Sequence, residues 1–153
     1  MLQKTLFDIP IWIKEVDNFD HKKGKLDEEL SKFPEVRNDT NTFLSNRNTQ
    51  RDGLSEFFGD IMSEELLELH SNLKKYKPEI EKLWVTDVWS VTYEKGDHQP
   101  THNHRSTGLS GILHLENPTN GPSLNIIMPW NDWITDTTNY YSVKYKVGTM
   151  MVM

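Results

Sequence analysis

The stretch Trp84-Val-Thr-Asp-Val-Trp-Ser-Val-Thr-Tyr93 is packed with β-branched and aromatic residues. This composition is typical of a β-strand, and Gly96-Asp97 directly after it is a turn signal. Further apolar segments with strand character follow it toward the C-terminus. They are residues 109–115, 123–128, 140–145 and 149–153, separated by turn signals at 117–122 and 131–136. The second half of the chain is therefore predicted to be rich in short strands.

The sequence before Leu83 has a different texture. Residues 24–33, rich in Lys, Glu and Leu, predict a short helix that Pro34 stops. Apolar residues at helical spacing predict a second helix from Leu54 to Tyr76, with a restart at Ser63. Two further segments complete this part: residues 6–13 suit an edge strand, and residues 37–51 are polar and predict a loop.

These elements predict an α+β fold in one domain spanning residues 1–153. Residues 1–83 form a mainly helical part and residues 84–153 a β-rich part. A sandwich or jelly roll is the expected arrangement of the strands, with the N-terminal helices packed on it.

Composition excludes several classes of protein. The 153 residues carry a formal net charge of −6, without the basic stripe that nucleic-acid binding needs. The lysines at 22, 23 and 25 lie among acidic residues and are predicted to form a solvated face. No apolar run approaches a membrane span, there is no signal-peptide pattern, and cysteine is absent. We therefore expect a cytoplasmic protein, in the host cytoplasm if the chain is viral, with no membrane or nucleic-acid partner.

Three of the six histidines, His98, His102 and His104, lie within seven residues just after the first strand and its turn. Residues two apart in an extended segment project from the same face, so His102 and His104 can aim their rings at one point. Neutral imidazoles so placed can hold Fe(II), Zn, Cu or Ni. The alternative is two solvent-facing loop histidines. His98 has the same parity, but Pro100 redirects the chain between it and the pair.

Other side chains around this segment have two interpretations each. His114 either faces the site or is a buried polar residue with partners of its own. Tyr93, Trp89 and Ser110 line a pocket or, as is commoner for strand aromatics, belong to the core. Arg105 either meets an anion beside the histidines or faces solvent.

The segment Tyr93-Glu-Lys-Gly-Asp-His-Gln-Pro-Thr-His-Asn-His-Arg-Ser-Thr-Gly-Leu-Ser-Gly-Ile-Leu-His-Leu115 resembles a group of 2-oxoglutarate/Fe(II) oxygenases of tailed phages and marine bacteria. That group shows a Gly, then His-x-His, then a Ser-Gly that leads into a hydrophobic strand. Leu6-Phe-Asp-Ile-Pro10 and Ser45-Asn46 are similar to its N-terminal features. The order of Tyr93, Gly96 and His102 also resembles the start of a prolyl-hydroxylase-like site, with His104 where an Asp is usual.

The resemblance implies a double-stranded β-helix that binds Fe(II) through His102 and His104, with 2-oxoglutarate as co-substrate. Tyr93, Ser110 and His114 are the weaker candidates for contacts with that co-substrate. The implied reaction couples oxidative decarboxylation of 2-oxoglutarate to hydroxylation of an unactivated C–H bond in a small molecule or a protein side chain. The protein would provide ligation, exclusion of water and positioning.

The chain departs from this family at its C-terminal end. In the family, a late His completes the iron site and a following Arg pairs with the distal carboxylate of 2-oxoglutarate. Here no His follows His114 and the last Arg is Arg105, so we expect either a fragment of a longer product or a protein without the distal half of the site. Two alternatives without catalysis follow: a cupin-like metal-binding module, or a structural domain that forms homo-oligomers through an exposed sheet edge.

Overall fold

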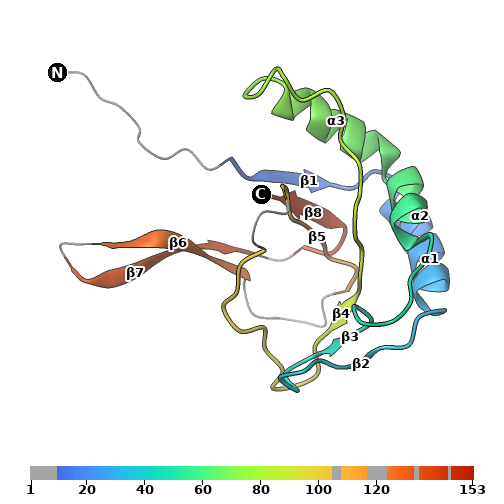
Figure 1. Ribbon diagram of the computed structural model, residues 1–153, viewed down its shortest axis with the longest axis horizontal. Coiled ribbons are helices and arrows are strands. Elements are labelled where there is room, and N and C mark those ends of the chain that lie inside the picture. The colour runs from blue at the N-terminus through green and yellow to red at the C-terminus, as the bar shows by residue number, and fades with distance from the viewer. Residues whose placement is uncertain (1–9, 105–107, 117–123, 133–134, 145) are drawn as a thin grey trace. The chain divides into compact units, whose positions relative to one another are not determined.

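The computed structural model describes residues 10–104, 108–116, 124–132, 135–144 and 146–153, with the backbone alone at 128–132. In this part of the chain, helices and short antiparallel strands form an α+β fold, as predicted (Figure 1). The chain divides into two compact units: Met1–Asp17 with Leu109–Met153, and Asn18–Gly108. None of the described helices is long and apolar enough to cross a membrane.

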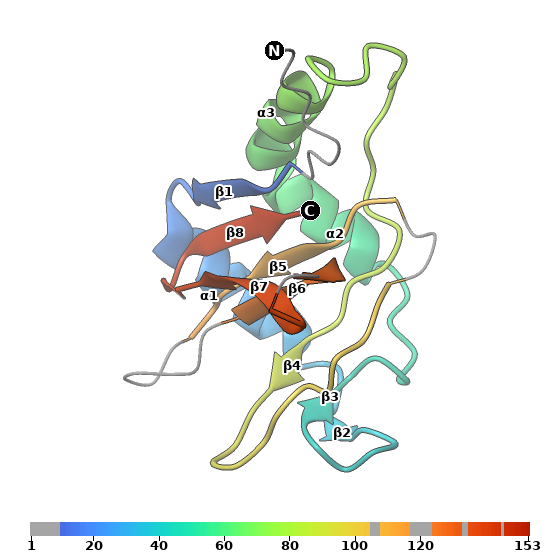
Figure 2. The same ribbon diagram turned by 90° about the vertical axis from the view of Figure 1, so that its left-hand side faces the viewer.

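The first unit is built on a three-stranded antiparallel sheet in the order β1-β8-β5 (Figure 2). Its strands are β1 (Trp12–Glu15), β5 (Gly111–Leu113) and β8 (Thr149–Val152). The central strand β8 is buried along its whole length and carries the core residues Met150, Met151 and Val152. A strand paired on both sides and covered on both faces needs a continuous apolar run, and the C-terminal sequence provides one.

A long hairpin completes this unit, with strands β6 (Leu124–Asp132) and β7 (Thr137–Val143) (Figure 1). The register shifts between Ile127 and Asn131, so the hairpin contains an irregularity there. The strands predicted at 109–115, 123–128, 140–145 and 149–153 are all present, although their ends differ. The edge strand predicted at 6–13 is shorter and later: β1 lies at an edge of the described sheet, and residues 6–9 lie outside the described residues.

The second unit contains the helices α1 (Phe19–Leu30), α2 (Leu54–Ile61) and α3 (Ser63–Leu73). The restart predicted at Ser63 is confirmed, since α2 ends at Ile61, Met62 alone separates the two helices, and α3 begins at Ser63. The helix predicted at 24–33 begins five residues earlier, after Asn18 in a left-handed conformation with φ of 52°. Leu26, Leu54, Met62, Leu69 and Leu73 form the buried core of the helices.

Three two-residue strands complete the second unit: β2 (Val36–Arg37), β3 (Leu44–Ser45) and β4 (Val91–Thr92), in the order β2-β3-β4. The loop predicted at 37–51 thus contains strand β3. The long strand predicted at 84–93 is wrong, because only β4 forms. Side chains bind the backbone just before it: Asn46 accepts a hydrogen bond from the Ser90 amide, and Arg51 donates to the Val88 carbonyl.

Candidate functional site

The loop after β4 carries the histidine pair, and its first turn is tightly held. Gly96 has a φ of +94°, a conformation that residues with a Cβ rarely adopt. The carboxylate of Asp97 accepts hydrogen bonds from the Glu94 amide at 2.9 Å and from Nη1 of Arg37 at 2.6 Å. Arg37 also pairs with the carboxylate of Glu94. Strand β2, through Arg37, therefore ties down the start of the loop that carries the histidines.

A second tie follows directly, because the amide of His98 donates to the carbonyl of Thr42 at 3.1 Å. The side chain of His98 is exposed, and no metal-ligand group in the described part of the chain includes it. The turn expected at Gly96-Asp97 is thus present. His98 helps to hold the loop through its backbone amide, and its side chain takes no part in that contact.

His102 and His104 bring their rings together, as expected for residues two apart in an extended segment. Their Nε2 atoms lie 3.2 Å apart, with ring centroids 4.9 Å apart and planes at 57°. Two nitrogens bound to one metal ion at 2.0–2.1 Å are separated by about 2.8–3.4 Å, for ligand angles between square and tetrahedral. The spacing of the pair therefore fits a shared metal ion.

The tautomer of His102 follows from its second nitrogen. Nδ1 lies 2.9 Å from the carbonyl oxygen of Pro100, which can only accept, so Nδ1 carries the proton. In the neutral ring, Nε2 then has a free lone pair directed at His104. A histidine ligand with its other N–H on a backbone carbonyl is the usual arrangement at metal sites. Without metal, Nε2–H of His104 can donate to that lone pair.

The electrostatics of His104 favour a neutral ring. Burial lowers the pKa of His104 below the ordinary value of 6.5, and His102 and the positive charge of Arg47 lower it further. A metal ligand must be unprotonated, so a lowered pKa keeps His104 available for binding at neutral pH. His102 is exposed and the ring of His104 is partly buried, so the pair forms a site that is open to solvent on one side.

Trp89 and Arg47 extend the site beyond the histidines. The indole of Trp89 stacks on His104, with ring centroids 6.4 Å apart and planes at 25°. The guanidinium carbon of Arg47 lies 4.5 Å above the Trp89 ring. Strand pairing explains this contact: Ser45 lies opposite Val91, and continuing the register past Asn46 and Ser90 brings Arg47 opposite Trp89.

Neither Arg47 nor Arg37 was expected at the site. Arg47 directly follows Ser45-Asn46, a pair that is distinctive only through the family resemblance. Nothing in the local sequence indicates that Arg47 contacts Trp89. Arg37 is 60 residues from its partner Asp97. Such contacts depend on the antiparallel pairing of β2, β3 and β4, which sequence periodicity does not reveal at strands of two residues.

The remaining predicted site residues are placed as follows. Tyr93 packs its ring against Phe43, 5.8 Å between centroids, and directs its hydroxyl to Gln99 at 3.3 Å. Ser110 pairs through its backbone with Met153, and His114 pairs through its backbone with Gly148 and Thr149. Burial lowers the pKa of His114. Ser110 and His114 belong to the first compact unit, and their contact with the co-substrate stays a prediction; Arg105 lies outside the described residues.

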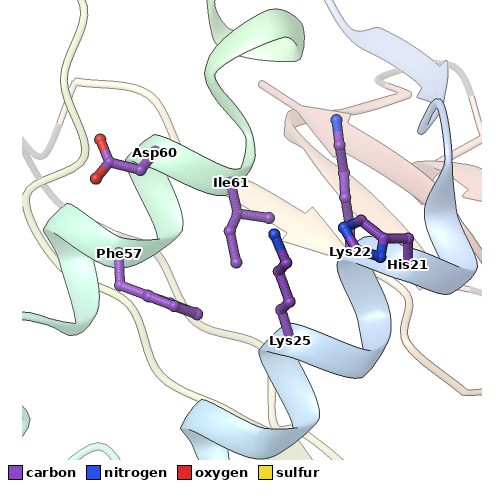
Figure 3. A pocket seen from close by; sticks show the side chains of 6 residues that line it. All are labelled: His21, Lys22, Lys25, Phe57, Asp60 and Ile61. Carbon is purple, nitrogen blue, oxygen red and sulfur yellow. The ribbon is translucent and has the colours of Figure 1, made fainter.

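A hollow of the second unit lies between α1 and α2, and no residue of the histidine loop lines it (Figure 3). It is lined by His21, Lys22, Lys25, Phe57, Asp60 and Ile61. The solvated face predicted for the lysines is wrong for Lys22, which is 9% exposed and bonds both carboxylate oxygens of the buried Glu65 at 2.7 Å. Because this charge is already paired, the hollow offers weaker ligand chemistry than the histidine pair.

Within the described ranges, no group of three or more His, Cys, Asp or Glu side chains is placed to hold a metal ion. The candidate centre is therefore a two-histidine centre with positions left for other ligands. Comparison of the chain with protein-family models, with curated proteins and with solved structures finds no match.

Proposed function

We propose that this chain belongs to a non-haem Fe(II)- and 2-oxoglutarate-dependent oxygenase and provides the first two iron ligands, His102 and His104. The observation that carries the proposal is the facing of the two Nε2 atoms at 3.2 Å, with the tautomer of His102 set by Pro100. Bound iron, with 2-oxoglutarate and dioxygen, supplies the oxidising chemistry for hydroxylation. The residues of the chain bind the metal, orient it and shield one side of it.

Three features of the second unit support this assignment. His104 is partly buried beside Trp89, which excludes water from one face of its ring. The loop is tied at Asp97 and His98 before it reaches the pair, so the ligands are held by the protein before metal binds. The two-ligand set leaves room for a chelating co-substrate and a third ligand.

The finer fold belongs to the same proposal. A double-stranded β-helix, or jelly roll, requires antiparallel strands in two facing sheets. The antiparallel sheet β1-β8-β5 and the hairpin β6-β7 are compatible with part of such a fold, with α1, α2 and α3 as the accompanying helices. The single-domain organisation over residues 1–153 stays a prediction.

The alternative function is a metal-binding or oligomerising β-domain without catalysis. The observation that favours it is the pair itself, because two protein ligands hold iron more weakly than three, and no third ligand accompanies them among the described residues. Strands β1 and β5 lie at the edges of the described three-stranded sheet, where a second copy of the chain could add a strand.

The first experiment measures metal affinity under anaerobic conditions, with Fe(II) and with Co(II) as a spectroscopic probe. We expect one ion per chain, and loss of at least tenfold in affinity in His102→Ala and in His104→Ala. His98→Ala is the matched control, because it removes an exposed histidine of the same loop and should leave the affinity unchanged. Equal losses in all three variants would mean that the histidines bind metal without a defined site.

The second experiment separates the two functions. The oxygenase proposal predicts succinate formation that requires both Fe(II) and 2-oxoglutarate and disappears in His102→Ala. The non-catalytic alternative predicts stoichiometric metal binding without succinate. Succinate formed equally well by wild type and His102→Ala would refute the proposed role of the pair.

A further inference from the structure

Strand β7 has one edge without a partner strand in the described part of the chain. It pairs with β6 alone, in a two-stranded sheet separate from β1-β8-β5 (Figure 1). Six of its seven residues are exposed, and only Val143 at its end is buried. A two-stranded hairpin is marginally stable by itself, and a third strand adds both hydrogen bonds and packing. The hairpin therefore gains stability from any strand that joins this edge.

The sequence of β7 does nothing to protect that edge. Proteins usually block free strand edges with charges, prolines or bulges. The strand Thr-Thr-Asn-Tyr-Tyr-Ser-Val contains no charged residue, proline or glycine. The opposite edge of the hairpin differs, because Pro129 in β6 has no N–H to donate and the register shifts between Ile127 and Asn131. The edge strands of the three-stranded sheet are shorter, with four residues in β1 and three in β5.

The hairpin also exposes apolar side chains beside this edge. Tyr140 is 63% exposed, and it lies opposite Ile127, which is 43% exposed. Tyr141, on the other face of the hairpin, is 47% exposed. Aromatic side chains on neighbouring antiparallel strands stabilise each other. A partner strand that brings its own aromatic residues to β7 is therefore the best match for this surface.

A charge of opposite sign stands just outside each end of β7. Asp136 directly precedes the strand and Lys144 directly follows it, and both side chains are exposed. Neither takes part in an ion pair among the described residues, whereas the nearby Lys146 binds Glu15. Asp136 and Lys144 are eight residues apart, about 27 Å of extended chain, so they cannot pair within one copy.

A second copy of β7 satisfies both charges in one register. In an antiparallel pair of strands, two opposite residues exchange hydrogen bonds only if both direct their N–H and C=O groups toward the shared edge. A pairing of β7 with β7 centred on Tyr140 meets this condition and engages all seven residues. The same register places Asp136 of each copy opposite Lys144 of the other. A parallel, in-register pairing would set like charges against each other, which is destabilising.

We propose that two copies of this chain associate through β7, in an antiparallel two-fold pairing centred on Tyr140. The two hairpins then form one sheet in the order β6-β7-β7-β6, with an ion pair between Asp136 and Lys144 at each end of the central pairing. Because each copy offers β7 once, the symmetry closes the assembly as a dimer. The inference does not rest on the metal site, and it holds whether or not His102 and His104 bind iron.

The test measures the dissociation constant of the dimer by analytical ultracentrifugation of the full chain. We expect a monomer–dimer equilibrium between about 5 and 500 µM, as for a small interface. Asp136→Lys sets two lysines against each other at both ends of the pairing, and Lys144→Asp does the same with two aspartates. Each variant should raise the dissociation constant about tenfold, because two attractive cross-strand pairs become repulsive.

The decisive measurement mixes the two variants in equal amounts. A heterodimer of Asp136→Lys with Lys144→Asp again has opposite charges at both ends, so the mixture should dimerise about as tightly as wild type. The double variant that carries both changes should recover for the same reason. This recovery reports contact between copies, because the two positions are too far apart to interact within one chain. It also shows that the single variants fold, since a misfolded chain would not regain dimerisation on mixing.

Two control variants make the same changes of charge at exposed positions of the second unit. Asp39→Lys matches Asp136→Lys, and Lys82→Asp matches Lys144→Asp. Both should leave the dissociation constant as in wild type. Losses as large as those of the β7 variants would assign the effect to net charge and overturn the inference.

Three further outcomes would overturn it. A wild-type chain that stays monomeric over the whole concentration range would exclude the second copy and leave β7 to a strand of a different protein. Dimers unaffected by Asp136→Lys and Lys144→Asp would place the interface elsewhere on the chain. Absence of recovery in both the mixture and the double variant would exclude the antiparallel register centred on Tyr140.

Discussion

His102 and His104 face each other through their Nε2 atoms at 3.2 Å, while Nδ1 of His102 donates to the carbonyl of Pro100 at 2.9 Å. The backbone thus selects the tautomer in which the lone pair of His102 points at its neighbour. Pro100 therefore has two roles in this loop: its ring interrupts regular secondary structure, and its carbonyl orients the ring of His102. This relationship underlies the proposed metal site.

Stability should fall as the pH drops below about 6.5. The pKa values of His104 and His114 are both lowered in the folded chain, mainly by burial, so the unfolded chain binds more protons between the folded and unfolded pKa values. Stability therefore rises with pH through this window and is lost as the pH falls through it. Urea unfolding at pH 7.5, 6.5 and 5.5 measures the slope.

The control for this slope is His114→Gln, which removes one of the two groups. The variant should show a shallower loss of stability between pH 6.5 and 5.5. A slope equal to that of wild type would mean that burial of His114 does not affect its protonation.

Asp97→Asn should loosen the loop that carries the histidines. The Glu94 amide and the Arg37 guanidinium donate hydrogen bonds to the Asp97 carboxylate and stabilise its charged form, which lowers the pKa of Asp97. The stability from this contact is present above the ordinary pKa of 3.8 and is lost as the pH falls below it. In the variant we expect a several-fold loss of Co(II) affinity at pH 7.

The readout for Asp97→Asn pairs metal titration with the acid limb of the unfolding curve. The neutral amide should abolish the part of the acid-induced loss that belongs to Asp97. Asp39→Asn, at an exposed position between β2 and β3, is the matched substitution and should leave the metal affinity as in wild type.

Glu65→Leu should destabilise the second unit strongly. Glu65 is 1% exposed, and each of its carboxylate oxygens accepts a hydrogen bond from Nζ of Lys22 at 2.7 Å. Replacing Glu65 therefore leaves the buried ammonium of Lys22 without its main partner. Breaking a buried ion pair on one side costs about 3–5 kcal/mol of unfolding free energy. Chemical denaturation measures this loss.

The single variant Lys22→Met and the double variant Lys22→Met with Glu65→Leu complete the thermodynamic cycle. Replacing both charges by apolar side chains of similar size should recover most of the lost stability. A double variant as unstable as Glu65→Leu would show that packing at these positions, and not the uncompensated charge, causes the loss.

Asn46→Ala should cost about 1–3 kcal/mol, because the part-buried Ser90 amide then loses its acceptor on the buried Asn46. The same change should weaken the contact of Arg47 with Trp89, since the bond between Asn46 and the Ser90 amide joins the two segments that carry these residues. Denaturation measures the first effect, and the near-ultraviolet dichroism of the tryptophans reports the second. Asn48→Ala, at an exposed position two residues on, should affect neither.

The sequence by itself determined the features whose causes are local. His102 and His104 face each other because side chains two apart in an extended segment share a face, and Pro100 precedes them. The restart at Ser63 and the strand-rich C-terminal half, including the apolar run of β8, follow from periodicity and residue type. Each of these depends on neighbours within a few positions.

Only the tertiary structure decided the contacts between distant segments. Lys22 is buried because Glu65 lies opposite it on α3, and Arg47 meets Trp89 because β3 pairs with β4. The strand predicted at 84–93 fails for the same reason, since the side chains of Asn46 and Arg51 bind its backbone in place of a ladder. These contacts join segments 37 to 60 residues apart, so they form only when the whole chain folds. Strands of two residues carry too little periodicity for the sequence to reveal which segments pair.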